Sequence, residues 1–332
     1  MSITVPAEWS RHRAMWLGFP SHAELWETDL EAAQDEVAAL ARALAGPGGE
    51  AVRLMVCGDE AMAAARARLE GVANIEFVPG RFGDIWLRDT GPIFTSPDEA
   101  AAFRFNGWGG KYELEGDDEV AAQIGEVQPA RLSRHDFILE GGALDHDGEG
   151  TILTTRQCLL NPNRNPGWNE ETAEAALREA LGAKKVLWLG DGLRNDHTDG
   201  HVDNLARFVA PGVVACPIAW GRGDPNARVY DEAAQLLSAM TDAAGRRLTV
   251  MRVPSPGWIN GEDRQPIPAS HMNFLIANKA VIVPLYDDKR AGEFACEALR
   301  SLFLGREVIG LPSKAILTGG GSFHCITQQV PA

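Results

Sequence analysis

The feature of this sequence that most limits its fold is a recurring unit of strand, helix and further extended pieces. The polar or glycine-marked ends of apolar runs fall at Asp89, Glu140, His201, His271 and Cys325. These positions are 51, 61, 70 and 54 residues apart. Repetition at such a period predicts units that are stacked or arranged radially, in place of two unlike halves. Five units around one axis would bring one strand end from each into a shared central site.

Hydrophobic periodicity predicts the individual elements. Ala-rich or amphipathic stretches predict helices at residues 30–44, 59–69, 169–181, 229–244 and 290–303. Short apolar runs predict strands, including those at residues 53–58, 74–80, 84–94 and 101–105. No stretch resembles a linker, so we expect one α/β domain over residues 1–332. A doubly wound open sheet is the alternative fold, but no GxGxxG motif follows a first strand.

The composition is that of an ordinary globular protein with excess negative charge. The net charge of −15 disfavours nucleic-acid binding, which needs a basic face. An acidic field attracts small cationic ligands, although acidity also serves solubility alone. No apolar run reaches the roughly 18 residues of a membrane span, and the N-terminus has no apolar secretory signal. Five widely separated cysteines without a CxxC pair indicate reduced thiols, so we expect a cytoplasmic protein.

The stretch TGGGSFHC, which ends at Cys325, presents a thiol after three consecutive glycines. Glycines allow a backbone to approach a ligand closely, and a thiolate is a strong nucleophile. Cys325 is therefore a candidate nucleophile. The alternative is a small buried apolar residue, which is the usual role of a free cysteine.

Two carboxylates stand at predicted strand ends. Asp89 lies in WLRDTGP, three residues after Trp86, where a plain turn before the proline is an equally good interpretation. Glu140 follows the apolar run FIL and precedes two glycines. The acidic residues that come next, in DHDGEG, lack the final acidic ligand of a calcium loop, and a hairpin turn explains them better.

The densest polar cluster is NDHTDGHVDN. Its four residues His197, Asp199, His201 and Asp203 would share one face of an extended segment. They could ligate zinc or iron. Alternatively, His201 is a general acid and base and Asp203 holds a cation. Two turn-rich stretches, residues 105–112 and 156–168, are expected to form walls of the site, with Cys158 in the core.

Taken together and in order, these motifs resemble those of the agmatine deiminases, which belong with the peptidyl-arginine deiminases of bacterial type. The matching stretches are WLRDTGP, FNGWGGKY, EGGA, TTRQCLLNPNRNP, HTDGHVDN and GGGSFHCITQQ. The resemblance covers essentially the whole chain and implies a five-bladed pseudo-symmetric α/β propeller of the pentein type. It also implies that the enzyme uses no metal and no organic cofactor.

The resemblance implies a role for each site residue. Cys325 corresponds to the nucleophile and His201 to the general acid and base. Asp89 and Asp203 correspond to the carboxylates that bind the guanidinium group. Glu140 is similar to the acidic residue that orients the histidine, and Trp86 resembles an aromatic wall beside the substrate.

The resemblance also implies the reaction. Two carboxylates would hold a planar guanidinium with its carbon over the sulfur, and the bound cation would favour the thiolate. Attack by Cys325 and loss of ammonia would give a covalent amidino-cysteine, which water then hydrolyses to a ureido product. The expected partner is thus a small cationic guanidine, with agmatine first and arginine or a guanidino acid second. A homodimer is possible.

Three positions depart from the family pattern. Ser322 and Phe323 stand where the family usually has GGGNIHC, and His271 stands where a tyrosine is expected. All three are predicted to lie near the centre and therefore to bear on the choice of substrate. Two rival functions are a hydrolase with a metal at His197, Asp199, His201 and Asp203, and a non-catalytic binding scaffold.

Overall fold

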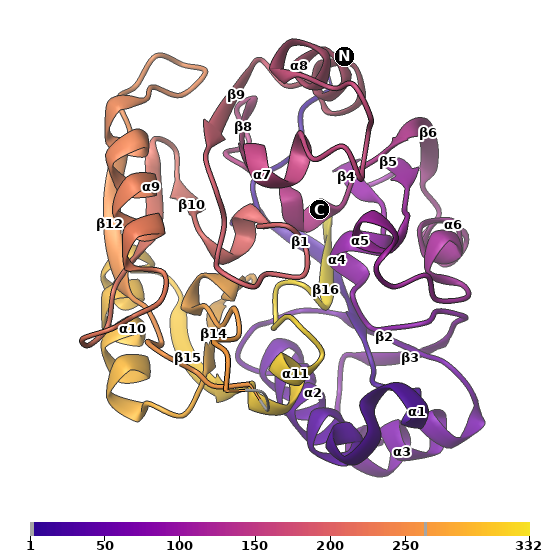
Figure 1. The fold of residues 1–332 in the computed structure, drawn as a ribbon. Helices are drawn as coiled ribbons and strands as arrows, with labels where there is room; N and C mark the ends of the chain where they lie inside the picture. The colour runs from indigo at the N-terminus through magenta and orange to yellow at the C-terminus, as the bar shows by residue number, and fades with distance from the viewer. Residues whose placement is uncertain (1–2, 262–263) are drawn as a thin grey trace.

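The computed structural model describes residues 3–261 and 264–332. Within these residues the strands form five small sheets arranged around a common centre, with the longer helices toward the periphery (Figure 1). Four sheets have three strands and one has four. This arrangement confirms the expected α/β ring of five units.

Four of the units repeat one topology. In each, a first strand pairs antiparallel with a middle strand, a helix follows, and a third strand pairs parallel with the middle one. A parallel pair needs a crossover connection, which the helix supplies. In chain order the units comprise β4 (Ile93–Ser96), β5 (Glu99–Arg104), α6 (Val120–Val127) and β6 (Arg131–Ile138); β7 (Asp145–His146), β8 (Thr151–Thr155), α8 (Glu170–Leu181) and β9 (Lys185–Leu189); β10 (Arg207–Ala210), β11 (Val213–Ile218), α9 (Ala227–Ala239) and β12 (Thr249–Pro254); and β13 (Leu275–Ile276), β14 (Ala280–Leu285), α10 (Lys289–Leu302) and β15 (Glu307–Pro312).

The remaining unit joins the two ends of the chain. Its middle strand is β1 (His12–Gly18), which pairs in parallel with β2 (Val52–Val56) across helix α2 (Leu30–Ala45). Its first strand is the C-terminal β16 (Thr327–Pro331), antiparallel to β1. A further crossover, α3 (Asp59–Leu69), leads to β3 (Ile75–Pro79) at the outer edge. The last strand of the chain thereby closes the ring.

The helices fill the spaces between neighbouring sheets. Helix α10 packs against β15 of its own unit and against β12 of the preceding one, and α2 likewise contacts both β2 and β15. The face that α10 buries carries Ala291, Ala295 and Leu299, at the three- and four-residue spacing of an amphipathic helix. Apolar burial between blades therefore holds the ring together.

Short helical elements occupy the connections. They are α1 (Ala23–Trp26), η1 (Glu27–Asp29), α4 (Leu87–Thr90), α5 (Gly107–Gly110), η2 (Asp117–Glu119), η3 (Gly141–Ala143), α7 (Arg156–Leu159), η4 (Val202–Asn204), η5 (His271–Asn273) and α11 (Lys314–Thr318). In the part of the chain that the structure describes, we find no helix that combines the length and the apolar character needed to cross a membrane.

The five predicted helices are confirmed, but the strand predicted at 84–94 is wrong over most of its length. The Thr90 hydroxyl donates to the Trp86 carbonyl at 3.1 Å, and the backbone bonds of this segment close the single turn α4. Only the end of the stretch is extended, as β4. The other four polar positions of the repeat, Glu140, His201, His271 and Cys325, also lie in or beside short turns that lead into the first strand of a unit. The sequence had predicted them at the ends of strands.

Ring closure by β16 predicts the effect of a C-terminal truncation. A chain that ends at Ile326 lacks β16, so β1 loses its antiparallel partner and the contacts that Arg88 makes with Gln328 and Gln329 disappear. We expect a large loss of thermal stability, measured by calorimetry, whereas removal of the exposed Ala332 alone should have little effect. A truncated chain that unfolds at the full-length midpoint would contradict this role for β16.

Candidate active site

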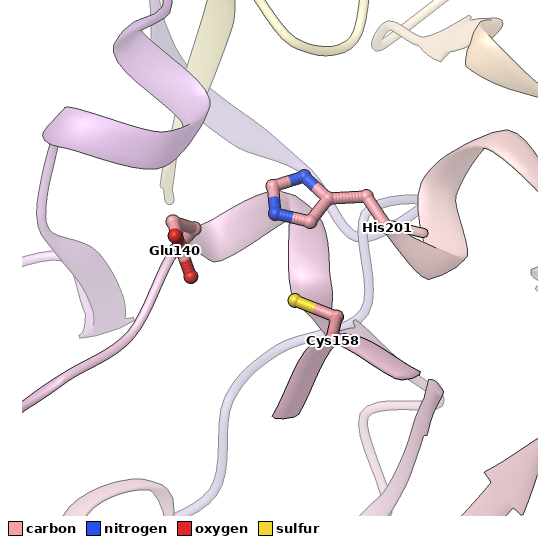
Figure 2. Close-up of side chains that lie close together, drawn as sticks. All are labelled: Glu140, Cys158 and His201. Atoms are coloured by element: carbon pink, nitrogen blue, oxygen red, sulfur yellow. The ribbon is translucent and has the colours of Figure 1, made fainter. Parts of the chain in front are cut away.

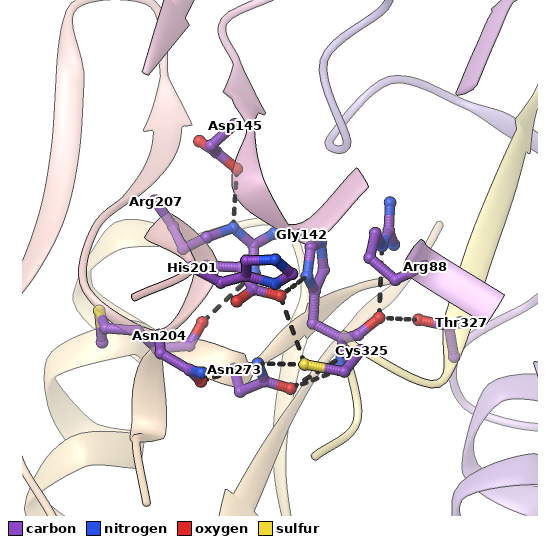
Figure 3. Close-up of polar contacts among 12 residues, drawn as sticks. Arg88, Gly142, Asp145, His201, Asn204, Arg207, Asn273, Cys325 and Thr327 are labelled. Atoms are coloured by element: carbon purple, nitrogen blue, oxygen red, sulfur yellow. Dashed lines mark hydrogen bonds and ion pairs between the residues drawn. The ribbon is translucent and has the colours of Figure 1, made fainter. Parts of the chain in front are cut away.

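Five equivalent turns converge at the centre of the ring (Figure 3). Four of them are α4, η3, η4 and η5, and the fifth is the turn at residues 323–326 that enters β16. The residues that precede the turns are Trp86, Glu140, His201, Ser270 and Ser322. Three residues further along the chain, the five turns carry Asp89, Ala143, Asn204, Asn273 and Cys325, respectively. The site is therefore built from matching positions of the five units.

Cys325 lies at the centre and is 5% exposed. Its Sγ atom is 3.4 Å from Asp203 Oδ2 and 3.0 Å from Asn273 Nδ2, which donates to it. Burial, followed by the carboxylates of Asp203 and Asp89, raises the pKa of the Cys325 thiol well above its usual value. While no cation neutralises the carboxylates of Asp203 and Asp89, the protonated thiol form of Cys325 is favoured.

Asp89 occupies the matching position of α4. Its Oδ1 atom accepts the backbone N–H of Gly142 at 2.9 Å, and its Oδ2 accepts the indole N–H of Trp108 at 2.9 Å. Trp108 adopts a left-handed φ of 55°, which is uncommon for a bulky residue. Burial, with the nearby charges of Asp203 and Glu140, raises the pKa of Asp89.

His201 is fully buried between two carboxyl groups. Its Nδ1 is 3.7 Å from Asp89 Oδ1, and one of its ring nitrogens lies within 4.8 Å of both Cys158 Sγ and a Glu140 oxygen (Figure 2). Burial lowers the pKa of His201, but Asp89, Cys158 and Glu140 together raise it well above its usual value. Neither ring nitrogen has a hydrogen-bond partner among the described residues. His201 is thus favoured in its protonated form beside Asp89, Cys158 and Glu140.

Asp203 lies on the other side of the thiol. Its Oδ2 is 2.8 Å from His324 Nδ1, and its Oδ1 has no hydrogen-bond partner among the described residues. Although burial opposes ionisation, the hydrogen bond and charge of His324, with His201 and Arg207, lower the pKa of Asp203 below its usual value. Asp203 is therefore a carboxylate with one open oxygen.

Gly142 shows how closely these groups approach one another. A Cβ atom on this residue would lie 2.7 Å from His201 Nδ1, 2.8 Å from Asp89 Oδ1 and 3.1 Å from Asp203 Oδ2. The EGGA stretch therefore needs glycine here because three polar side chains meet at one point.

Trp86 and Glu140 border the centre. The Trp86 indole donates to Asp84 at 2.6 Å and stacks on Trp26. A Cβ on Gly321 would lie 2.5 Å from the Trp86 ring and 3.2 Å from Cys325 Cβ, so this glycine lets the indole lie beside the cysteine. Glu140 accepts a hydrogen bond from Arg164 Nε at 2.5 Å, and both side chains are buried.

The four residues of the HTDGHVD cluster do not share one face. Asp199 is paired with Lys111 and Arg164, each at 2.7 Å, and His197 Nδ1 is 3.0 Å from the Tyr112 hydroxyl. Only His201 and Asp203 point to the centre. Among the described residues, two groups of side chains each place three potential metal-ligand atoms within 4.8 Å of one another. They are Glu140–Cys158–His201 and Asp147–Glu149–Asp242. In both groups an arginine pairs with a carboxylate, Arg164 with Glu140 and Arg246 with Glu149 and Asp242, which disfavours a metal cation.

The three departures from the family pattern lie behind the centre. Phe323 is fully buried in the apolar core, and the Ser322 hydroxyl is 2.6 Å from that of Ser313. His271 Nδ1 is 2.8 Å from the Pro254 carbonyl, and its ring stacks on Tyr286. The residue of η5 that reaches the cysteine is Asn273. The expectation that His271 is the residue by which this unit contributes to the central site is therefore wrong.

Sequence reasoning missed Asn273, His324 and Arg88. Asn273 Oδ1 accepts the backbone N–H groups of His324 and Cys325, so it holds the turn that carries the thiol. Arg88 Nη1 donates to Gln328 and Gln329 of β16 at 2.7 Å. An alignment of the five turns with one another would have revealed Asn273, which occupies the same position as Asp89 and Cys325.

Comparison with solved structures defines the class. The chain superimposes on an agmatine deiminase of Enterococcus faecalis with a TM-score of 0.92 and 33% identity, over 99% of this chain and 96% of that one. The structure of DDAH from Pseudomonas aeruginosa shares the fold at a TM-score of 0.56 and 14% identity, over 96% of this chain and 99% of that one. The protein is thus a pentein-type α/β propeller, as expected, and a hydrolase of the guanidine-modifying group.

The particular family follows from sequence comparison. The chain belongs to the Porphyromonas-type peptidyl-arginine deiminase family, whose profile matches residues 4–331. It is 40% identical to the agmatine deiminase of Stutzerimonas stutzeri and 38% identical to that of Pseudomonas aeruginosa, in each case over 99% of this chain and 95% of the relative. These relatives confirm the resemblance to the agmatine deiminases.

The space at Gly142 yields a first test of the site. Gly142→Ala introduces a Cβ among His201, Asp89 and Asp203 and must displace at least one of them. We expect deiminase activity to fall by about 100-fold, since a misplacement of about 1 Å has an effect of this size. Gly190→Ala is the matched control, because no atom lies within 4 Å of its Cβ position. Equal activities of the two variants would contradict the described geometry.

The charge of Asp203 yields a second test. Asp203→Asn removes a negative charge beside the thiol, so the pKa of Cys325 should fall and alkylation by neutral iodoacetamide at pH 7 should become faster. Deimination should become slower, because a cation then meets only one carboxylate. Peptide mapping of the alkylated Cys325 measures the first effect, with Asp191→Asn, at an exposed position, as the control. Alkylation that is slower or unchanged would contradict the assigned electrostatics.

Proposed function

We propose that the protein hydrolyses agmatine to N-carbamoylputrescine and ammonia through a covalent intermediate on Cys325. The observation that carries the proposal is the set of open polar atoms around the thiol. Asp203 Oδ1 and both nitrogens of His201 lack hydrogen-bond partners among the described residues, and each is buried. A ligand that binds between Asp89 and Asp203 must bring N–H donors to the two carboxylates. A planar guanidinium ion has this property.

The choice of agmatine rests on the relatives. Proteins with this name are 36–40% identical to the chain over 99% of its length. A substrate-bound agmatine deiminase of C. jejuni has a TM-score of 0.86 and 29% identity, over 99% of this chain and 96% of that one. The net charge of −15 is favourable for a substrate with two positive charges. A cytosolic location is part of the proposal, since all five cysteines are free.

Substrate binding activates the nucleophile. In the free protein, burial and the two carboxylates raise the pKa of Cys325. A guanidinium bound between Asp89 and Asp203 neutralises these charges, so the thiol releases its proton to solvent as the cation enters, and that proton balances the later conversion of ammonia to ammonium. The same contacts hold the guanidinium carbon over Sγ.

Attack on the carbon forms a C–S bond and a tetrahedral adduct. His201, already an imidazolium, protonates one amino group, the C–N bond breaks and ammonia leaves. The product of this half-reaction is an amidino-thioether that keeps the positive charge between Asp89 and Asp203. Glu140 and Asp89, on either side of the ring, orient His201 for this transfer.

Hydrolysis completes the reaction. Neutral His201 takes a proton from a water molecule, and the hydroxide attacks the same carbon. The C–S bond then breaks, and the sulfur takes up the remaining proton. Cys325 returns to its thiol form, His201 to its imidazolium form, and the ureido product is released. Trp86 forms a wall beside the reacting carbon.

A panel of guanidines tests the proposal. Purified protein is incubated with agmatine, arginine, 4-guanidinobutyrate and butylguanidine, and ammonia and ureido products are quantified. We expect agmatine to have the largest kcat/KM by at least about tenfold, which corresponds to about 1.4 kcal/mol of transition-state binding. Cys325→Ala should release no ammonia while still binding agmatine in calorimetry. A preference for arginine or the guanidino acid would refute the substrate, and turnover by Cys325→Ala would refute the mechanism.

A further inference from the structure

A row of buried groups with alternating charge leads away from the site. It runs from Asp203 through His324 and Glu8 to Arg207 and Asp145. Every member is less than one-tenth exposed. The groups come from η4, the ring-closing turn, the segment before β1, β10 and β7. Figure 3 shows the part of this network around Arg207, Asp145 and the cysteine. The row thus connects the centre with three units and the N-terminal segment.

His324 is the link between the row and the substrate site. Its Nδ1 is 2.8 Å from Asp203 Oδ2, and its Nε2 is 3.1 Å from Glu8 Oε2. Both partners are carboxylates, which only accept hydrogen bonds when ionised. Both ring nitrogens must then carry a proton, so the geometry requires an imidazolium between two carboxylates. Hydrogen bonds of this kind are the strong, charge-assisted ones.

Glu8 is itself fixed on its far side. It pairs with Arg207 and accepts the backbone N–H of Ile276 at 2.6 Å. Arg207 also binds Asp145 at 2.7 Å and donates to the Phe274 carbonyl at 3.0 Å. These contacts leave Glu8 no freedom to follow a moving histidine. They anchor the His324 ring from the side opposite the substrate.

The neighbours of Asp203 show why the histidine matters. The charged or titratable groups around it are His201 from its own turn, Asp89 and Arg88 from α4, Cys325 and His324 from the ring-closing turn, and Arg207 from β10. Asp89 and a thiolate both oppose its ionisation. Among the cations, His324 alone is hydrogen-bonded to it in the described structure. His201 is needed for proton transfer and loses its charge during the reaction.

We propose that His324 is a positioning residue whose imidazolium, anchored by Glu8, keeps Asp203 ionised and aimed at the substrate cation throughout turnover. This inference rests on the proposed function. His324 touches neither the reacting carbon nor the thiol, and acts only through Asp203.

The test compares the pH dependence of kcat/KM for agmatine in wild-type protein and two variants. In His324→Asn the amide can donate to Asp203, and in His324→Gln it can donate to Glu8, but neither carries a charge. His324 lowers the pKa of Asp203, so its removal raises that pKa and Asp203 becomes protonated at higher pH. We expect the acid limb to move upward by about one pH unit, so that kcat/KM falls most at the acid end of the profile and less at pH 7.

His271→Asn is the matched control. His271 is an equally buried histidine in a neighbouring turn, but it faces the Pro254 carbonyl and Tyr286 in place of carboxylates. Its replacement should lower thermal stability and leave the acid limb where it is. If neither His324 variant folds, Glu8→Gln removes only the anchor and should move the limb in the same direction.

A second readout separates this inference from the identity of the substrate. Chloroacetamidine carries a planar amidinium cation in place of the guanidinium and is expected to alkylate Cys325, with formation of a C–S bond and loss of chloride. The acid limb of its alkylation rate should shift upward in the His324 variants as well. If wild-type protein is labelled but does not hydrolyse agmatine, the substrate proposal fails and the labelling data still decide the role of His324. Acid limbs that coincide with wild type in the folded variants would overturn the inference.

Discussion

The structure depends on two buried carboxyl groups, those of Asp89 and Asp203, held beside the thiol of Cys325. Burial of a carboxylate is costly unless hydrogen bonds and opposite charges compensate it. Asp89 is compensated by Gly142, Trp108 and His201, and Asp203 by His324. The compensation is incomplete, and burial together with the charges of Asp203 and Asp89 raises the pKa of Cys325. A cation bound between the two carboxyl groups would complete the charge balance and favour loss of the thiol proton.

The ring provides this arrangement by repetition. The equivalent position of the five turns is occupied by Asp89, Ala143, Asn204, Asn273 and Cys325. Asn204 and Asn273 bond to each other at 3.0 Å, and Gly142 allows Asp89 to lie close to His201 and Asp203. The turn that carries Cys325 leads directly into β16, which pairs with β1 at the other end of the chain.

Much of this could be predicted from the sequence. The period of the polar positions indicated five units, and the helical patterns at 30–44 and 59–69 match α2 and α3 within one residue. The residues Asp89, His201, Asp203 and Cys325 do meet at one place. The failures have physical causes. WLRDT has an apolar, strand-like pattern, but the backbone bonds of a single turn prevail there. His271 is a titratable residue at the expected interval, yet the turn directs Asn273 inward and leaves His271 against a carbonyl. Long-range pairs such as His324 with Glu8 join residues at opposite ends of the chain and leave no local pattern.

The central claim is that the sulfur of residue 325 attacks the guanidinium carbon while two acids hold the cation. It is tested most directly by rapid acid quench of the reaction with agmatine labelled with ¹³C at the guanidine carbon, followed by peptide mapping. The account predicts that the peptide containing Cys325 gains the mass of agmatine less ammonia, carries the ¹³C atom, and loses both at the rate at which product forms. Product formation without a labelled Cys325, or a labelled Cys158 in its place, would contradict it.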